Sequence, residues 1–385
     1  MAYFRNRTVN LLNLHYGIHV LAISGGGAFF TVYLLKAGVP VPGVLASLAL
    51  ILMGRFAIRP AIVGFAARFG LKRLVIAGTL LVACEFPLLA EVHGANAALF
   101  ALIALAAMAD TVYWSTYHAY FAALGDDAHR GHQIGAREAI AAVVGIVAPL
   151  LAGWMLVAFG PRVAFGATAA IAVISALPLL WTPDVAVARH VPGAWKAATP
   201  GMLLFLADGW IGSGYVFVWQ VALFVSLGEN FLVYGGALAI SALVGAAGGL
   251  LLGRHIDAGH GGRAVWIALG GMAAIILLRA AAATGHPVVA VAAQALGALE
   301  NCLYAPTIMT AVYNQAKRAP CTLRFHVAAE GGWDVGGACG LLIAAALAEW
   351  RVPLSAGIAL SLIGVAGLFV LLRRYYARNA MDVAG

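Results

Sequence analysis

Charged residues are scarce in this 385-residue sequence, since Asp, Glu, Lys and Arg together make up only 10% of it. A typical soluble domain is about one quarter charged, so the composition excludes an ordinary soluble fold. Cysteine is scarce as well, and the four cysteines have neither disulfide nor zinc spacing. We therefore expect no disulfide framework, no metal and no other cofactor.

Several motifs of enzymes and nucleic-acid-binding proteins are also missing. The sequence has no G-x-x-x-x-G-K-[ST] phosphate-binding loop, which argues against nucleotide hydrolysis. It has no H-E-x-x-H or G-x-S-x-G motif either, so a polytopic membrane enzyme is only a distant alternative; the residues that come nearest to a catalytic cluster are Asp126, Asp127, His129 and His132. The net charge of +8 comes from basic residues scattered over short segments. A nucleic-acid-binding protein gathers them on one face, so we expect no nucleic-acid partner.

Long apolar stretches fill most of the chain. Apolar residues make up 63% of it, and the mean hydropathy is +0.94. A helix of about 20 apolar residues spans the hydrocarbon core of a bilayer, where backbone groups must hydrogen-bond within their own segment. The sequence therefore predicts an all-α membrane protein with twelve transmembrane helices, at residues 10–36, 42–66, 73–91, 96–123, 133–159, 162–181, 200–228, 232–255, 263–284, 288–315, 325–349 and 352–373.

Lys and Arg are distributed unevenly between alternate connecting segments. Seventeen of the 23 lie on one set of segments, whereas only Lys36, Arg162 and Arg351 lie on the opposite set. Loops that are rich in Lys and Arg face the cytoplasm. We therefore expect both termini in the cytoplasm and the chain in the inner membrane of a bacterium. The N-terminal segment MAYFRNRTVN lacks a cleavage site, so we expect a retained first helix rather than a signal peptide.

A polar segment divides the chain into two halves. The sequence TPDVAVARHVPGAWKAA at 182–198 is the longest stretch between predicted spans. We expect an N-terminal six-helix bundle at 1–181, a cytoplasmic linker at 182–199 and a C-terminal six-helix bundle at 200–385. A shift of 192 residues aligns Glu138 with Glu330 in the fifth span of each half. Repeated halves around a central site are typical of secondary transporters.

Two loops in corresponding places of the halves have similar sequences. The first reads GFAARFGLKR (64–73), and the second reads GRHIDAGHGGR (253–263). Together with the six-plus-six layout, these loops resemble the major facilitator superfamily, whose signature is a glycine, an aspartate, and then a glycine with a basic cluster. The second loop keeps the aspartate as Asp257, whereas the first has Arg68 where an acid is expected. The resemblance implies the fold of this superfamily and secondary transport.

The fifth predicted span contains several glycines around a proline. Proline with nearby glycines bends a helix and permits close packing. The pattern resembles the glycine/proline motif of many exporters in the superfamily, although Val144, Ala148 and Ala152 replace other expected glycines. The alternative interpretation is packing without directional meaning. We favour export on the basis of Gly135, Gly145, Pro149 and Gly153.

Basic residues inside the spans are candidates for the transport site, because a charge in the bilayer is costly. Arg55 and Arg59 lie one turn apart on one helical face. They need an anion, supplied either by the substrate or by a protein carboxylate such as Asp110. His15 and His19 share a face of the first span, where lining a cavity and protonation are favoured over metal binding, which needs more ligands.

Three other spans place a carboxylate and aromatic residues on one helical face. A carboxylate in such surroundings takes up a proton as they become drier. The predicted proton-coupling residues are Asp110, Asp208 and Glu300. The predicted substrate-binding residues are Arg55, Arg59, His15, His19, Trp114, Tyr117, Tyr215, Trp219 and Tyr304.

Other charged residues near the cytoplasmic ends of the spans are expected to form ion pairs that open and close the transport path. The predicted gating residues are Glu138, Asp257, Arg263, Glu330 and Asp334. Glu85 is expected to be structural, and Arg279 has no partner that the sequence identifies.

These features together predict a secondary active transporter. We expect it to move a small organic solute, anionic or amphipathic, by alternating access with coupling to protons, as a monomer in the lipid bilayer. Export is the favoured direction. The alternative is a proton-coupled uptake symporter for an organic anion.

Overall fold

The computed structural model describes residues 6–124, 130–256, 261–283 and 285–384, and these ranges contain helices and turns but no β-strand. The first half of the chain forms α1 (Arg7–Ser24), η2 (Gly26–Phe29), α2 (Phe30–Lys36), α3 (Val41–Phe69), α4 (Leu71–Ala90), α5 (Ala97–Leu124), α6 (Arg130–Ala158), α7 (Pro161–Ser175) and η3 (Leu177–Trp181). The second half forms α8 (Ala194–Gly212), η4 (Ser213–Val218), α9 (Trp219–Ser226), α10 (Phe231–Ile256), α11 (Gly261–Ala282), α12 (Pro287–Arg318), α13 (Thr322–Glu349), α14 (Leu354–Ala359) and α15 (Ser361–Ala384).

Twelve helical segments among the described residues are long and apolar enough to cross a bilayer. Four of them combine shorter pieces into one span: α1 with η2 and α2, α7 with η3, α8 with η4 and α9, and α14 with the first part of α15. The predicted all-α fold with twelve transmembrane helices is thereby confirmed. The helices form because a bilayer offers no water to bond with the backbone.

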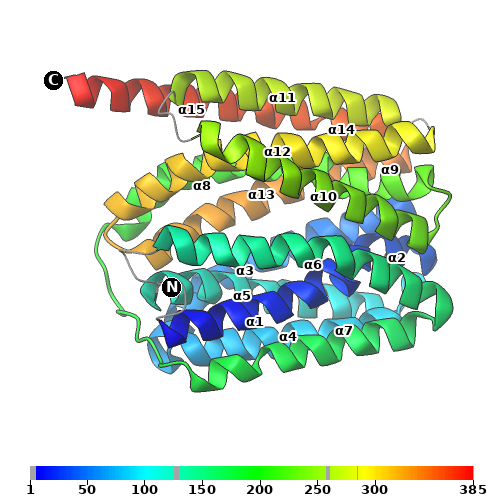
Figure 1. The fold of residues 1–385 in the computed structure, drawn as a ribbon, viewed down its shortest axis with the longest axis horizontal. Helices are drawn as coiled ribbons and strands as arrows, with labels where there is room; N and C mark the ends of the chain where they lie inside the picture. The colour runs from blue at the N-terminus through cyan, green and yellow to red at the C-terminus, as the bar shows by residue number, and fades with distance from the viewer. Residues whose placement is uncertain (1–5, 125–129, 257–260, 284, 385) are drawn as a thin grey trace. The chain divides into compact units, whose positions relative to one another are not determined.

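The first compact unit consists of Met1–Val39, Gly54–Val191 and Phe231–Ala239. Within it α4 packs along α5 and α7, and α1 packs against α6 and α7 (Figure 1). A glycine permits the close approach of α4 and α5, since a Cβ on Gly78 would lie 2.6 Å from the backbone nitrogen of Tyr113. This contact brings α4 against the part of α5 that carries polar residues.

The second compact unit consists of Pro40–Met53, Pro192–Asn230 and Ile240–Gly385. Within it α8 packs along α13 and α15, and α11 packs against α12 and α15 (Figure 1). Small residues again decide the packing, because a Cβ on Gly336 of α13 would collide with the Leu206 carbonyl of α8. The division of the chain into 1–181, 182–199 and 200–385 stays a prediction.

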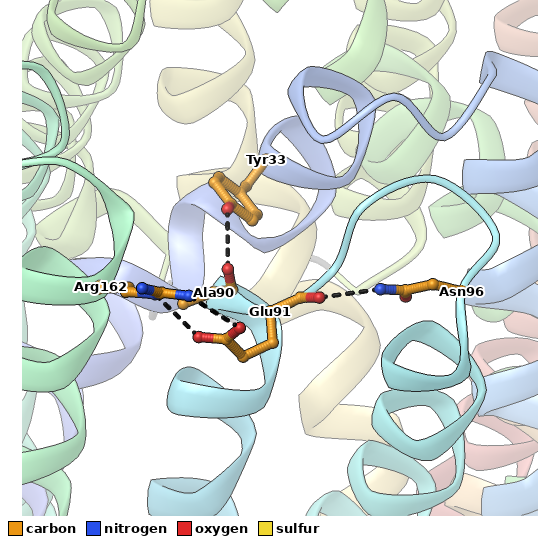
Figure 2. A network of polar contacts seen from close by, with 5 residues as sticks. All are labelled: Tyr33, Ala90, Glu91, Asn96 and Arg162. Carbon is orange, nitrogen blue, oxygen red and sulfur yellow. Dashed lines mark hydrogen bonds and ion pairs between the residues drawn. The ribbon is translucent and has the colours of Figure 1, made fainter.

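A polar network surrounds the end of α4 (Figure 2). Arg162, at the start of α7, donates to both carboxylate oxygens of Glu91, at 3.0 and 3.2 Å. The Asn96 side chain donates to the Glu91 carbonyl at 2.9 Å, and the Tyr33 hydroxyl donates to the Ala90 carbonyl at 3.4 Å. The last carbonyls of a helix have no partner within it, so these bonds stabilise the point at which α4 ends.

Candidate functional site

Arg55 and Asp110 form an ion pair inside the first unit. Arg55 Nη1 lies 3.2 Å from Asp110 Oδ2, and the two side chains are 14% and 31% exposed. The helices α3 and α5 approach closely here, since a Cβ on Gly54 would lie 2.8 Å from the Cβ of Ala107. Of the two anions considered for Arg55, a protein carboxylate and a substrate, the structure places the carboxylate of Asp110 beside it.

A second carboxylate and a second arginine extend this ion pair into a cluster. Glu85 of α4 is buried and interacts electrostatically with Asp110 and Arg55. Arg59 is 2% exposed, and its Nη1 donates to Ser115 Oγ at 2.9 Å. The sequence predicts no transport role for Glu85, because the residues that interact with it lie on other helices and a local pattern does not identify them. The cluster of Arg55, Arg59, Glu85 and Asp110 is called the first charge cluster below.

His15 of α1 is held by two hydrogen bonds. Its Nδ1 lies 2.6 Å from the Ser175 carbonyl, and its Nε2 lies 3.0 Å from the Tyr113 hydroxyl. A carbonyl only accepts, so Nδ1 carries the hydrogen and, in the neutral ring, Nε2 accepts from Tyr113. His19 and Tyr117 are buried too, and both rings stack on Tyr113, with centroids 4.0 and 5.5 Å away. These predicted site residues thus form one buried stack between α1 and α5.

Asp110, Trp114 and His118 form a partly exposed polar stripe on α5. The rings of Trp114 and His118 stack with centroids 5.6 Å apart. The same helix also exposes the apolar residues Ala104 and Met108. Met108 and Asp110 are two positions apart, which is about 200° around the helix axis. The apolar stripe suits lipid, whereas a stripe with a carboxylate suits a water-filled path.

In the second unit, Asp208 of α8 accepts hydrogen bonds from two aromatic side chains. The Tyr304 hydroxyl of α12 donates to Asp208 Oδ1, and the side chain of Trp333 on α13 is a second partner of the carboxylate. The helix α13 comes this close because Gly209 lies against the Trp333 carbonyl. Asp208 and Tyr304, predicted from different spans, are therefore in direct contact.

The other predicted residues of this unit gather around Arg279 of α11. The Arg279 guanidinium carbon lies 4.0 Å from the centroid of the Tyr215 ring and 5.2 Å from that of Trp219, which is within cation–π range. The Trp219 indole donates to Gln294 Oε1 at 2.7 Å, and Glu300 interacts electrostatically with both Arg279 and Tyr215. Sequence patterns miss Arg279 and Gln294 as site residues, because they do not show which helices face each other.

The predicted gating residues lie on several helices. Asp257 and the side chain of Glu138 are outside the described residues. Arg263 is exposed at the start of α11, and Glu330 is partly exposed on α13. Asp334, also on α13, is fully buried. Their gating roles stay predictions.

An acid from elsewhere in the chain lies at the first signature loop. Asp184, which follows η3, accepts a hydrogen bond from the Lys72 amide at 3.2 Å in the first turn of α4. The Lys72 ammonium donates to two carbonyls of the segment before Asp184, at 2.8 and 2.7 Å. Gly70 has a φ of 81°, and a Cβ there would collide with the Asp184 carboxylate. A carboxylate is thus present at this loop although residues 64–73 contain none.

Each unit thus has arginine and carboxylate side chains next to aromatic rings, within membrane-spanning helices. Carboxylates exchange protons, and arginines bind carboxylate and phosphate groups through paired hydrogen bonds. Among the residues that the structure describes, no three His, Cys, Asp or Glu side chains are placed to hold a metal ion. These side chains can exchange protons and bind organic anions.

Comparison with known proteins adds a family and two similar structures. The family model described as Major Facilitator Superfamily matches residues 14–320. A solved POT family transporter in complex with 5-aminolevulinic acid is 10% identical, with a TM-score of 0.72 over 95% of this chain and 96% of the other. A solved auto-inhibited POT family peptide transporter is 15% identical, with a TM-score of 0.67 over 97% of both chains. No curated protein matches the sequence.

Proposed function

The chain belongs to the major facilitator superfamily and is a transporter of that type, and we propose that it moves a small organic solute, anionic or amphipathic, with coupling to protons. The proposed setting is the inner membrane of a bacterium, with both termini in the cytoplasm and a single chain as the working unit. Export is the proposed direction, on the basis of the glycine and proline residues of α6.

The observation that carries this proposal is the first charge cluster. Arg55, Asp110 and Glu85 interact with one another within membrane-spanning helices, and Arg59 lies one turn beyond Arg55 on α3, where it donates to Ser115. Ionisable groups at such depth are costly and mark solute and proton pathways. The polar stripe next to the cluster offers the Trp114 and His118 rings to the apolar part of a solute.

Protons and the solute meet at Arg55. Its ion pair with Asp110 is weakened when Asp110 takes up a proton, because the neutral acid no longer attracts the guanidinium. Arg55 is then open to the carboxylate of a solute. Binding of the proton and binding of the anion therefore favour each other, and the reciprocity holds for both ligands.

The buried members of the predicted set have a supporting role in this proposal. His15, His19 and Tyr117 hold α5 against α1 through the stack on Tyr113. In the second unit, Asp208 and Glu300 take part in proton transfer, while Tyr215, Trp219 and Tyr304 line their surroundings. Arg263, Glu330 and Asp334 open and close the path.

The test begins with a ligand screen and ends with exchange. Purified protein is screened by thermal shift against organic acids and amphipathic compounds, with 5-aminolevulinic acid as one of them. A stabilising compound is then radiolabelled and used in counterflow into proteoliposomes. We expect exchange well above that of protein-free liposomes. Stabilisation by ligands without exchange would contradict transport and point to a receptor or an enzyme.

Because the proton and the anion favour each other's binding at Arg55, this ion pair favours a second candidate, proton-coupled uptake of an organic anion, whereas export rests on the glycine and proline residues of α6 alone. If proton and anion bind together, an inward proton gradient carries the anion into the cell. Energised membrane vesicles of both orientations separate the two directions. Accumulation in inside-out vesicles supports export, whereas accumulation in right-side-out vesicles supports uptake.

A further inference from the structure

Arg279 is a buried arginine in the middle of the second unit. Only 4% of it is exposed, and it lies on α11, a helix that is otherwise apolar around it. A buried cation in a membrane-spanning helix is costly unless hydrogen bonds and an opposite charge compensate it. The surroundings of Arg279 therefore indicate what it does.

The first partner of Arg279 is the backbone of a π-helical turn, η4, in the seventh span. The amide of Trp219 donates to the carbonyls of Gly214 and Val216. The Tyr215 carbonyl, four residues before Trp219 and its acceptor in a regular α-helix, instead accepts from Arg279 Nη1 at 2.5 Å. π-Helical turns inside α-helices are rare and are frequent at functional sites.

The side chains around the guanidinium hold it in one place. The Tyr215 and Trp219 rings lie within cation–π range, and Gln294 Oε1 accepts from Arg279 Nη2 at 3.3 Å. The helix α12 presents Gly297 to the guanidinium, and a Cβ there would collide with Nη2. The Tyr215 hydroxyl donates to the Gly297 carbonyl at 3.0 Å. Arg279 thus connects the π-helical turn to α12.

The opposite charge comes from Glu300, one turn beyond Gly297 on α12. Glu300 is 6% exposed. Its carboxylate interacts with Arg279 and the Tyr215 hydroxyl, although neither carboxylate oxygen has a hydrogen bond of standard geometry to a described residue. The other titratable groups that act on this region are Cys302, Tyr304 and, through Tyr304, Asp208. Arg279 is therefore the compensating cation for Glu300.

We propose that Arg279 is a positioning residue for proton coupling, which holds the π-helical turn of the seventh span and responds to the charge of Glu300. This inference rests on the proposed role of Glu300 in proton transfer. With Glu300 charged, the pair is neutral and the turn is held. With Glu300 protonated, Arg279 becomes an uncompensated buried cation, which is unfavourable, and its hold on the turn weakens. Protonation in α12 thereby reaches the backbone of the seventh span.

The test measures amide hydrogen exchange of residues 213–219 by mass spectrometry on the purified full-length protein, without any solute. After correction for intrinsic rates, we expect exchange in this segment to be faster at pH 5 than at pH 8. Glu300→Gln removes the charge at every pH, so this variant should exchange fast at both pH values. Arg351→Lys, at an exposed arginine outside the proposed site, is the control and should leave residues 213–219 unchanged.

Substitutions of Arg279 separate its charge from its hydrogen bonds. Arg279→Lys keeps the charge but lacks the planar fork that reaches two acceptors. It should raise exchange at residues 213–219 by about tenfold at pH 8, as expected for a local opening. Arg279→Met leaves the Glu300 carboxylate without its compensating cation, so the thermal midpoint of this variant should fall more at pH 8 than at pH 5. The double variant Arg279→Met/Glu300→Gln should recover the midpoint and lose this pH dependence.

One result overturns the inference: exchange at residues 213–219 that changes neither with pH nor with Glu300→Gln. This holds even if every Arg279 variant fails to fold, because the wild type and Glu300→Gln are sufficient. The readout needs no transport. If the wild type showed no counterflow, only the proposed function would be wrong. If counterflow were intact but amide hydrogen exchange at residues 213–219 did not change, only the role of Arg279 would be wrong.

Discussion

Asp110 is the residue on which the first charge cluster depends. It pairs with Arg55, interacts with Glu85, and begins the partly exposed stripe that continues with Trp114 and His118. A carboxylate that is both in an ion pair and partly exposed can receive a proton from water. Asp110 is therefore the group whose substitution tells most about coupling.

Asp110→Asn should abolish proton-driven accumulation while leaving solute binding largely intact. The amide keeps the size and one acceptor oxygen of the carboxylate but neither its charge nor its proton exchange. The measurements are accumulation in energised vesicles and thermal-shift binding of the same solute. Asp184→Asn, beside the first turn of α4, is the matched control and should retain accumulation. Unchanged uphill transport by Asp110→Asn would remove its role in coupling.

Arg55→Ala should weaken binding of an anionic solute far more than binding of its neutral amide. The loss for the anion should be about tenfold or more, which corresponds to about 1.4 kcal/mol. Binding of both compounds is measured by isothermal calorimetry. Arg351→Ala removes an exposed arginine and should change neither affinity. An equal loss for the anion and the amide would indicate that Arg55 is only structural.

At the scale of helices, residues from elsewhere in the chain contact the places where a helix begins or departs from regular geometry. The segment after η3 places Asp184 on the first turn of α4, and Gly70 leaves space for it. The seventh span contains a π-helical turn whose carbonyl binds an arginine of α11. The first feature depends on Asp184, from the segment after η3, and the second depends on Arg279, from α11.

Asp184→Ala should lower the stability of the folded protein by about 1 kcal/mol, which is typical for the loss of a capping side chain. Asp184→Asn keeps an acceptor oxygen and should lose less. The thermal midpoints of both variants, measured in the same detergent, decide between a capping role and no role. If the two variants were equally stable, the hydrogen bond from the Lys72 amide would contribute nothing measurable.

Hydropathy predicts the twelve spans well, because each helix satisfies its own backbone within lipid. It does not predict the breaks inside spans. The 3-10 turn at Gly26–Phe29 and the π-helical turn at Ser213–Val218 each lie inside a stretch that hydropathy gives as one continuous span. The π-helical turn is stabilised by Arg279, which lies more than sixty residues later in the chain. A local pattern carries no information about such a partner.

At the scale of the whole molecule, the membrane orientation is predicted from the charges of the connecting segments. The uneven distribution of Lys and Arg predicts that both termini and the segment 182–199 are cytoplasmic. Green fluorescent protein fused to the C-terminus should then fluoresce, whereas alkaline phosphatase fused there should be inactive. Alkaline phosphatase inserted into the turn at residues 91–96 is the matched control and should be active. The reverse pattern would invert the orientation.

By itself, the sequence determined the helical class, the number of spans and the identity of the ionisable residues inside them. These properties follow from local composition, since lipid selects apolar helices one segment at a time. Only the tertiary structure decided the partners: Asp110 and Glu85 for Arg55, Tyr304 for Asp208, and Gln294 and the Tyr215 carbonyl for Arg279. Partners depend on which helix faces lie opposite each other, and close-approach glycines such as Gly54, Gly78 and Gly297 set those faces.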